Sequence, residues 1–149
     1  MTAVRVDRNK GRRTAVQLLY ASELTDETPV AIAEAGAAPE EVELTEYALK
    51  LLDGVQANLS EIDGMLDGAS ENWAVSRMPI VDKCILRVAV FEMLKVPEVP
   101  VSVTINEAVE LAKDFGGEDE SHRFVNGVLG KIAAQLENPA PAAEAGDQE

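Results

Sequence analysis

The stretch from residue 80 to residue 94 places the strongest constraint on the fold. It reads IVDKCILRVAVFEML, and on a helix its apolar side chains would face nearly every direction. These side chains are Ile80, Val81, Cys84, Ile85, Leu86, Val88, Ala89, Val90, Phe91, Met93 and Leu94. A helix that is apolar on almost every side is buried among other elements. The stretch therefore predicts a central helix, opened by Met78-Pro79 and closed by Pro97 and Pro100.

Further helices are predicted on both sides of this central one, because apolar residues recur with helical spacing. We expect them near 10–24, 29–35, 45–60, 60–72, 102–116 and 121–136, with Ser60, Ser102 or Thr104, and Ser121 as N-caps. Aromatic residues make up only 4% of the chain, so Leu, Val, Ile and Ala must fill the core. The sequence therefore predicts an all-α protein of about seven helices.

The length of 149 residues suits one domain with its own core. We expect that domain over 1–136, with a basic N-terminal arm at 1–13 and a disordered, acidic Pro/Ala tail at 137–149. Cys84 is the only cysteine and reads as a small buried hydrophobe. No apolar run reaches the roughly 20 residues of a membrane span, and no signal peptide is evident. We therefore expect a soluble cytoplasmic protein.

Charge is distributed unevenly along the chain. The net charge is −14, yet residues 1–20 carry +4 while residues 21–72 carry −12. Phosphate responds to the local potential within a Debye length of about 8–10 Å, not to the total charge. Arg12 and Arg13 lie near the N-terminus of a predicted helix, where the macrodipole disfavours cations. The basic end is therefore either an anion site or a frayed, solvated terminus.

No catalytic constellation is evident, and we expect no enzymatic activity, cofactor or metal. His122 is the only histidine, and the acids from Glu118 to Glu120 are typical of residues that precede a helix. Gly127 and Gly130 interrupt a predicted helix at a cost of about 1 kcal/mol each. They indicate either close helix packing or the close approach of a ligand.

Four blocks of sequence, in this order, resemble the NusB family of transcription antitermination factors. They are AVQLLY at 15–20, VDKCILRVAVFEML at 81–94, INEAVELAK at 105–113 and FVNGVLGK at 124–131. The resemblance implies two small helical subdomains, no catalysis, and binding of the boxA element of ribosomal RNA leader transcripts together with ribosomal protein NusE. It also implies that the complex joins the RNA polymerase elongation complex through other Nus factors.

The resemblance implies RNA contacts on two elements, the basic arm and the last helix. The basic arm supplies Arg8, Lys10, Arg12 and Arg13, although Asn9 and Asp7 make it thinner than the family pattern. The last helix supplies His122, Arg123, Phe124 and Asn126, with Phe124 either stacked on a base or packed in the core. Lys83 and Arg87 of the central helix either extend this basic surface or pair with acids of the chain.

The resemblance places the NusE contact at Tyr20, Asp82 and the acidic turn, where Asp119 and Glu120 compete for one family position. The turn reads GGEDESHR and is one residue longer than the family form. An acidic body suits a basic ribosomal partner. The resemblance leaves a monomer and a homodimer both open.

Two alternative functions are compatible with the same predicted fold. In the first, the acidic surface recruits a basic protein and no RNA is bound. In the second, the chain is a targeting domain like the one that ribosomal RNA cytosine methyltransferases can carry, although the chain holds no cofactor-binding domain.

Overall fold

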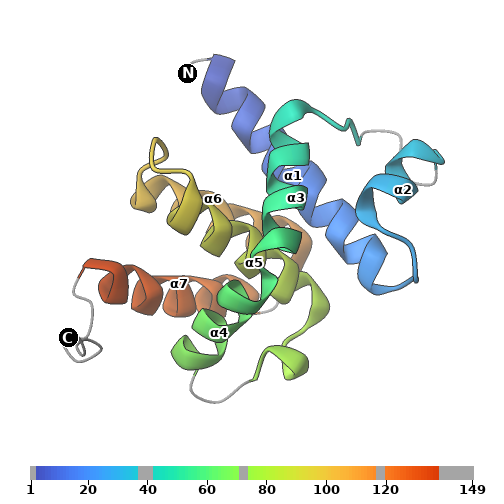
Figure 1. Cartoon of the computed structure of the whole chain (residues 1–149). Coiled ribbons are helices and arrows are strands. Elements are labelled where there is room, and N and C mark those ends of the chain that lie inside the picture. Colours follow the sequence, from blue (N-terminus) through green and yellow to red (C-terminus); the bar gives the residue numbers. More distant parts are fainter. Residues whose placement is uncertain (1–2, 37–41, 71–73, 117–119, 138–149) are drawn as a thin grey trace, which may run out of the picture.

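The structure of the protein, a computed structural model, describes residues 3–36, 42–70, 74–116 and 120–137 (Figure 1). Throughout these residues the regular structure is helical. The elements in chain order are α1 (Ala3–Glu23), α2 (Pro29–Glu34), α3 (Glu46–Ala57), α4 (Leu59–Ala69), the 3₁₀ helix η1 (Val75–Arg77), α5 (Ile80–Lys95), α6 (Val101–Gly116) and α7 (Ser121–Glu137). The predicted all-α fold with seven α-helices is confirmed.

Helix α5 lies at the centre of the packing, as its sequence predicted. It contacts α1, α3, α4, α6 and α7, and Ile85, Leu86 and Val90 are almost fully buried. Helices α1, α2 and α3 form one group of contacts, and α6 and α7 form another (Figure 1). Because α5 joins both groups, the two small subdomains share one hydrophobic core.

Helices α2 and α3 begin as their sequences dictate. The Thr28 side chain accepts a hydrogen bond from the Ala31 amide, and Thr45 accepts one from the Ala48 amide, both at 3.1 Å. Each bond satisfies an amide that the first helical turn leaves unpaired. After α2, Gly36 adopts a φ of 72°, a left-handed conformation that glycine allows at a helix end.

Several predicted helix starts were wrong. Helix α1 begins at Ala3, well before the predicted Asn9 or Lys10, so the described part of the basic arm is helical. Ser60 lies inside α4, whose N-cap is Asn58. Ser102 and Thr104 lie inside α6, where the Pro100 carbonyl accepts the amides of residues 103 and 104. Ser121 is the first residue of α7 rather than its cap.

The acidic tail beyond residue 137, Gly117 and Trp73 lie outside the described residues. Each helix of the described ranges is too short or too polar to cross a membrane.

Candidate nucleic-acid interface

The basic residues of α1 divide between the interior and the surface. Arg12 is only 3% exposed, whereas Lys10 and Arg13 keep about half of their side-chain surface exposed. Sequence reasoning placed Arg12 with the other cations of the arm, but the structure turns it into the core. A helix with 3.6 residues per turn points successive side chains in different directions, so neighbours such as Arg12 and Arg13 have different surroundings.

Glu92 on α5 holds Arg12 in the core and is itself 0% exposed. Arg12 Nε donates to Glu92 Oε2 at 2.7 Å, and the Thr104 hydroxyl donates to Glu92 Oε1, also at 2.7 Å. The Tyr47 hydroxyl donates to Glu92 Oε2 as well. We call Arg12, Tyr47, Glu92 and Thr104 the Glu92 cluster. It joins α1, α3, α5 and α6 through one carboxylate.

The Glu92 cluster was not predicted. Glu92 is an acid in the helix that the sequence predicts to be buried at the centre, and this was the available signal, because a buried carboxylate requires partners. Burial, and then the bond to Glu92, raises the pKa of Tyr47 above its ordinary value. The phenol therefore remains a hydrogen-bond donor at physiological pH.

The cations on the outer face of α1 have exposed partners. Lys10 pairs with Glu43, and Arg8 lies over the Tyr47 ring with its guanidinium carbon 6.0 Å from the ring centroid. Arg13 pairs with Asp114 of α6 and lies over Phe115, 5.1 Å from that ring's centroid. Exposed pairs of this kind contribute about 0–1 kcal/mol and exchange readily with another anion.

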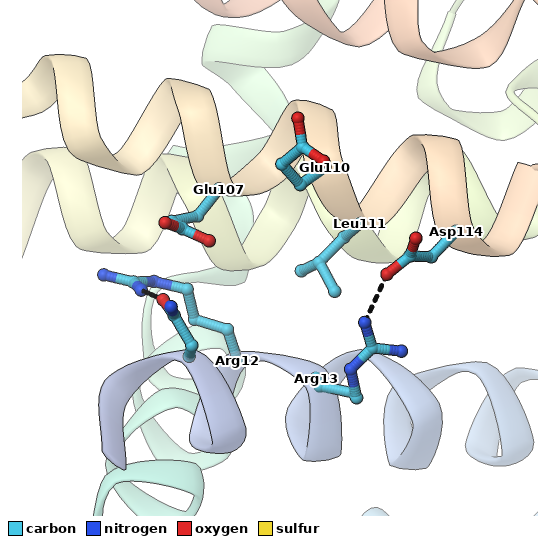
Figure 2. A pocket seen from close by; sticks show the side chains of 7 residues that line it. Arg12, Arg13, Glu107, Glu110, Leu111 and Asp114 are labelled. Carbon is cyan, nitrogen blue, oxygen red and sulfur yellow. Dashed lines mark hydrogen bonds and ion pairs between the residues drawn. The ribbon is translucent and has the colours of Figure 1, made fainter. Parts of the chain in front are cut away.

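A polar hollow of about 240 Å³ separates α1 from α6 (Figure 2). Its lining combines cations of α1 with acids of α6, and the residues are Asn9, Arg12, Arg13, Glu107, Glu110, Leu111 and Asp114. Figure 2 shows Arg13 reaching across to Asp114, while Arg12 donates to Asn9 on its own helix. The basic and acidic charges of the hollow therefore neutralise one another in part.

An apolar hollow of about 390 Å³ lies farther along the same face of α1. It is lined by Val16, Gln17, Tyr20, Ala21, Val81 and Phe115. Tyr20 is 38% exposed, which makes it one of the few large apolar side chains on the surface of the described residues. The hollow offers apolar contacts together with the Tyr20 hydroxyl.

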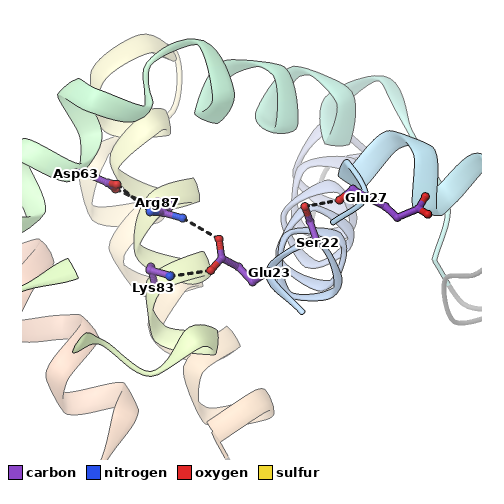
Figure 3. A network of polar contacts seen from close by, with 6 residues as sticks. All are labelled: Ser22, Glu23, Glu27, Asp63, Lys83 and Arg87. Atoms are coloured by element: carbon purple, nitrogen blue, oxygen red, sulfur yellow. Dashed lines mark hydrogen bonds and ion pairs between the residues drawn. The ribbon is translucent and has the colours of Figure 1, made fainter. Parts of the chain in front are cut away.

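Lys83 and Arg87 of α5 take part in an ion-pair network rather than standing free (Figure 3). Lys83 Nζ lies 2.8 Å from Glu23 Oε1, and Arg87 contacts Asp63 through Nε at 2.9 Å and Nη2 at 2.8 Å. Arg87 also lies 3.5 Å from Glu23. We call these four residues the Glu23 network. Of the two alternatives that the sequence left open, the structure contains the pairing with acids of the chain.

The candidate residues of α7 lie near its start. Arg123 is exposed and pairs with Glu120 at 3.2 Å, and Asn126 is exposed. His122 is partly buried, and Phe124 is partly buried against the core. Phe124 therefore combines core packing with partial exposure.

Gly127 and Gly130 face open space. A Cβ built on either residue would meet nothing within 4 Å, and both residues are exposed. Close helix packing, one of the two explanations that the sequence offered, is therefore wrong.

The predicted partner residues are only partly brought together. Tyr20 lines the apolar hollow beside Val81, but the next residue, Asp82, is only 3% exposed and already takes part in an interaction within the chain. Glu120 is exposed at the start of α7, and Asp119 lies outside the described residues.

Cys84 of α5 is a free, buried cysteine. Burial raises the pKa of the Cys84 thiol to about 12, so it stays protonated and is a poor nucleophile. The described ranges hold no group of three or more His, Cys, Asp or Glu residues placed to bind a metal ion.

Comparisons with known proteins give one consistent result. The sequence model of the NusB family matches residues 9–134. The transcription antitermination protein NusB of Myxococcus xanthus is 41% identical over 138 residues, covering 89% of this chain and 98% of that protein. The protein of the same name from Saccharopolyspora erythraea is 43% identical over 128 residues, with 85% and 86% covered.

Solved structures agree with the sequence comparisons. NusB of T. maritima superposes with a TM-score of 0.74 at 34% identity, covering 86% of this chain and 91% of that one. A chain from a complex of the antitermination factors NusB and NusE with dsRNA superposes with a TM-score of 0.70 at 26% identity, covering 85% and 96%.

Proposed function

The chain belongs to the NusB family of transcription antitermination proteins, and from this we propose that it binds boxA RNA of ribosomal RNA leader transcripts together with ribosomal protein NusE. The complex then joins the RNA polymerase elongation complex in the cytoplasm through other Nus factors. Its mechanism is assembly without catalysis. A relative of the same fold is found with both NusE and dsRNA, which supports this proposal.

The observation that carries the RNA part is the division of the α1 cations. Arg8, Lys10 and Arg13 lie toward the outer face, and the ion pairs of Lys10 and Arg13 are exposed enough for phosphate to replace the acid. Arg12 has a buried partner, so we assign it to anchoring α1 rather than to contacting RNA. The side chains of Lys83 and Arg87 are only 13% exposed and pair with Glu23 and Asp63, so we assign them to the Glu23 network rather than to RNA contacts.

The last helix supplies the second part of the RNA surface. Arg123 and Asn126 are exposed near the start of α7, and the partial exposure of Phe124 is compatible with contact to an unpaired base. His122 directly precedes Arg123 in the chain. The open glycines Gly127 and Gly130 continue this exposed face of the helix and leave room for a backbone to approach.

For NusE we propose the apolar hollow beside Tyr20 as the main contact. Its apolar wall and the exposed ring provide the kind of aromatic anchor that dominates protein interfaces. Glu120 and Asp119 add acidic charge suited to a basic partner. Asp82 is only 3% exposed, so we do not propose it as a direct contact with NusE.

Fluorescence anisotropy with a single-stranded boxA RNA and a scrambled strand, with and without NusE, tests the whole proposal. We expect a preference for boxA that falls as salt rises. Binding of NusE without any RNA preference in either condition would instead support the protein-interaction function.

The basic face of α1 predicts a specific loss. Replacing Arg8 and Lys10 by glutamine should weaken boxA binding about tenfold and reduce the log–log salt slope by about 1.4, since each phosphate contact on single strands contributes about 0.7. The matched control is the double change Lys50→Gln and Lys95→Gln. These two lysines are also about half exposed and ion-paired, with Glu98 and Glu61, but they lie on α3 and at the end of α5. Equal losses in both double variants would show that only total charge matters.

The apolar hollow predicts a loss of partner binding. Tyr20→Ala should weaken NusE binding about ten- to thirtyfold, as expected for removing a central aromatic contact worth roughly 2 kcal/mol. Leu24→Ala is the control, because Leu24 is 57% exposed one turn farther along but does not line the hollow. Calorimetric titration with NusE measures both. A larger effect of the Leu24 change would move the partner surface away from the hollow.

A further inference from the structure

Arg13 lies at the boundary between the two hollows. It lines the polar hollow, while the ring of Phe115 beneath its guanidinium lines the apolar one. Two successive residues of α6 therefore hold this side chain, Asp114 through a hydrogen-bonded ion pair and Phe115 through a cation–π contact. Figure 2 shows the Arg13 side chain extended toward Asp114 across the gap between the helices.

The position of Asp114 is unfavourable for its own helix. It lies in the last turn of α6, which ends at Gly116, where the macrodipole favours cations such as the neighbouring Lys113. Its side chain is 51% exposed, so the core does not require it either. The ion pair with Arg13 is the interaction that accounts for a carboxylate at this place.

The ion pair between Arg13 and Asp114 uses a guanidinium donor that an RNA phosphate would also bind. A guanidinium binds carboxylate and phosphate oxygens through the same fork of N–H groups. While Arg13 donates to Asp114 through Nη2, that N–H group is not available to a phosphate, and the carboxylate offsets part of the guanidinium charge. Because both partners are about half exposed, the two anions exchange at little cost.

We propose that Asp114 is an affinity-setting residue that competes with RNA phosphate for Arg13, while Phe115 keeps the guanidinium at the rim of the polar hollow. This inference rests on the proposed RNA-binding function. RNA binding then requires the Arg13–Asp114 pair to open, and removal of the Asp114 charge makes binding tighter.

The test compares Asp114→Asn with Glu110→Gln, each in the wild-type chain and in an Arg13→Gln chain. Both changes remove one carboxylate from α6 in the same hollow, but Glu110 pairs with Lys113, 3.6 Å away, instead of Arg13. Anisotropy with the single-stranded boxA RNA is measured across a salt series. Circular dichroism confirms that each variant is folded, as expected for changes at exposed positions.

We expect Asp114→Asn to tighten RNA binding about threefold more than Glu110→Gln does, a size typical of losing one exposed ion pair. The salt slope should stay nearly unchanged, because Arg13 makes the same phosphate contact in both proteins once its pair with Asp114 has opened. In the Arg13→Gln chain the two changes should have the same effect, since no guanidinium remains to be released.

Equal effects in the wild-type chain would overturn the competition, because only net charge would then matter. An advantage of Asp114→Asn that persists without Arg13 would overturn it as well. Weaker binding after Asp114→Asn would mean that the carboxylate orients Arg13 for RNA rather than withholding it. If the wild-type chain binds no RNA with or without NusE, the proposed function itself fails, and this result is distinct from the other three.

Discussion

The Glu92 cluster and the Glu23 network use the same chemistry in two different environments. Each links helices that are distant in sequence through ion pairs of one arginine, with one carboxylate in the cluster and two in the network. In the Glu92 cluster the paired side chains are 4% and 0% exposed, whereas the side chains of the Glu23 network are 13% to 34% exposed. Water therefore screens the network much more than it screens the Arg12–Glu92 pair of the cluster.

The comparison shows that burial decides what an ion pair does for this fold. Two buried charges repay their desolvation only when every donor and acceptor is satisfied, so breaking the set is costly. A partly exposed pair loses little when it opens, because water replaces the missing partner. The cluster therefore fixes how α1, α3, α5 and α6 meet, while the network adds a smaller stabilisation between α1, α4 and α5.

The largest expected effect comes from breaking the cluster. Glu92→Ala leaves the Arg12 guanidinium and two hydroxyl groups without their acceptor, and should lower the free energy of unfolding by about 3–5 kcal/mol. Urea unfolding followed by circular dichroism measures this loss. Changing Arg12→Met together with Glu92→Leu should recover part of it, because no buried charge then remains. A loss below about 1 kcal/mol would mean that the cluster stabilises the fold no more than an exposed ion pair does.

An intermediate effect is expected from the network. Arg87→Ala removes a two-pronged contact with Asp63 and a longer one with Glu23, and should cost about 1–2 kcal/mol, reduced from a buried pair by partial solvation. Lys95→Ala is the control, since its side chain is 44% exposed and its pair with Glu61 spans 3.7 Å. That change should cost less than about 0.5 kcal/mol. If Arg87→Ala cost as much as Glu92→Ala, burial would not separate the two regions.

The smallest expected effect is a pH dependence of folding stability that comes from Glu23 in the Glu23 network. The hydrogen bond from Lys83 holds the pKa of Glu23 below its ordinary value of 4.5. The folded state therefore binds fewer protons than the unfolded state in this range, and stability rises with pH. The contribution of Glu23 is fully present above pH 4.5 and is lost as the pH falls through the lowered pKa.

Comparing wild type with Glu23→Gln by urea unfolding, at neutral pH and below pH 4.5, isolates this contribution. The two proteins should differ by less than about 1 kcal/mol at neutral pH and converge in acid. A difference that grows on acidification would show that the shift has the opposite sign.

The fold was largely predictable because its strongest signals are local. The all-round apolar stretch at 80–94 marked the buried helix. The caps were not predicted correctly: Thr28 and Thr45 cap α2 and α3, whereas the serines and Thr104 expected as caps lie inside helices. The start of α1 was not predictable in this way. Its first turns carry cations at the positive end of the dipole, and contacts such as Lys10 with Glu43, more than 30 positions away, favour the helix there.

The candidate site was predictable as a set of residues but not as an arrangement. Sequence alone grouped Arg12 with Arg13, because both are arginines in one basic run. Their different surroundings depend on Glu92 and Asp114, which are 80 and 101 positions away. Such contacts appear only when the packing of α1 against α5 and α6 is known.

The central place of α5 also affects how the chain emerges from the ribosome. Helices α1 to α4 are made first, and their buried leucines, Leu18, Leu51 and Leu66 among them, belong to the core that α5 completes. At about 5–20 residues per second, the 16 residues of α5 take roughly 1–3 s to make, and the synthesis of α6 and α7 adds further time. For these seconds the nascent chain displays leucines that the finished protein hides, and this is the interval in which chaperones that bind apolar segments act on it.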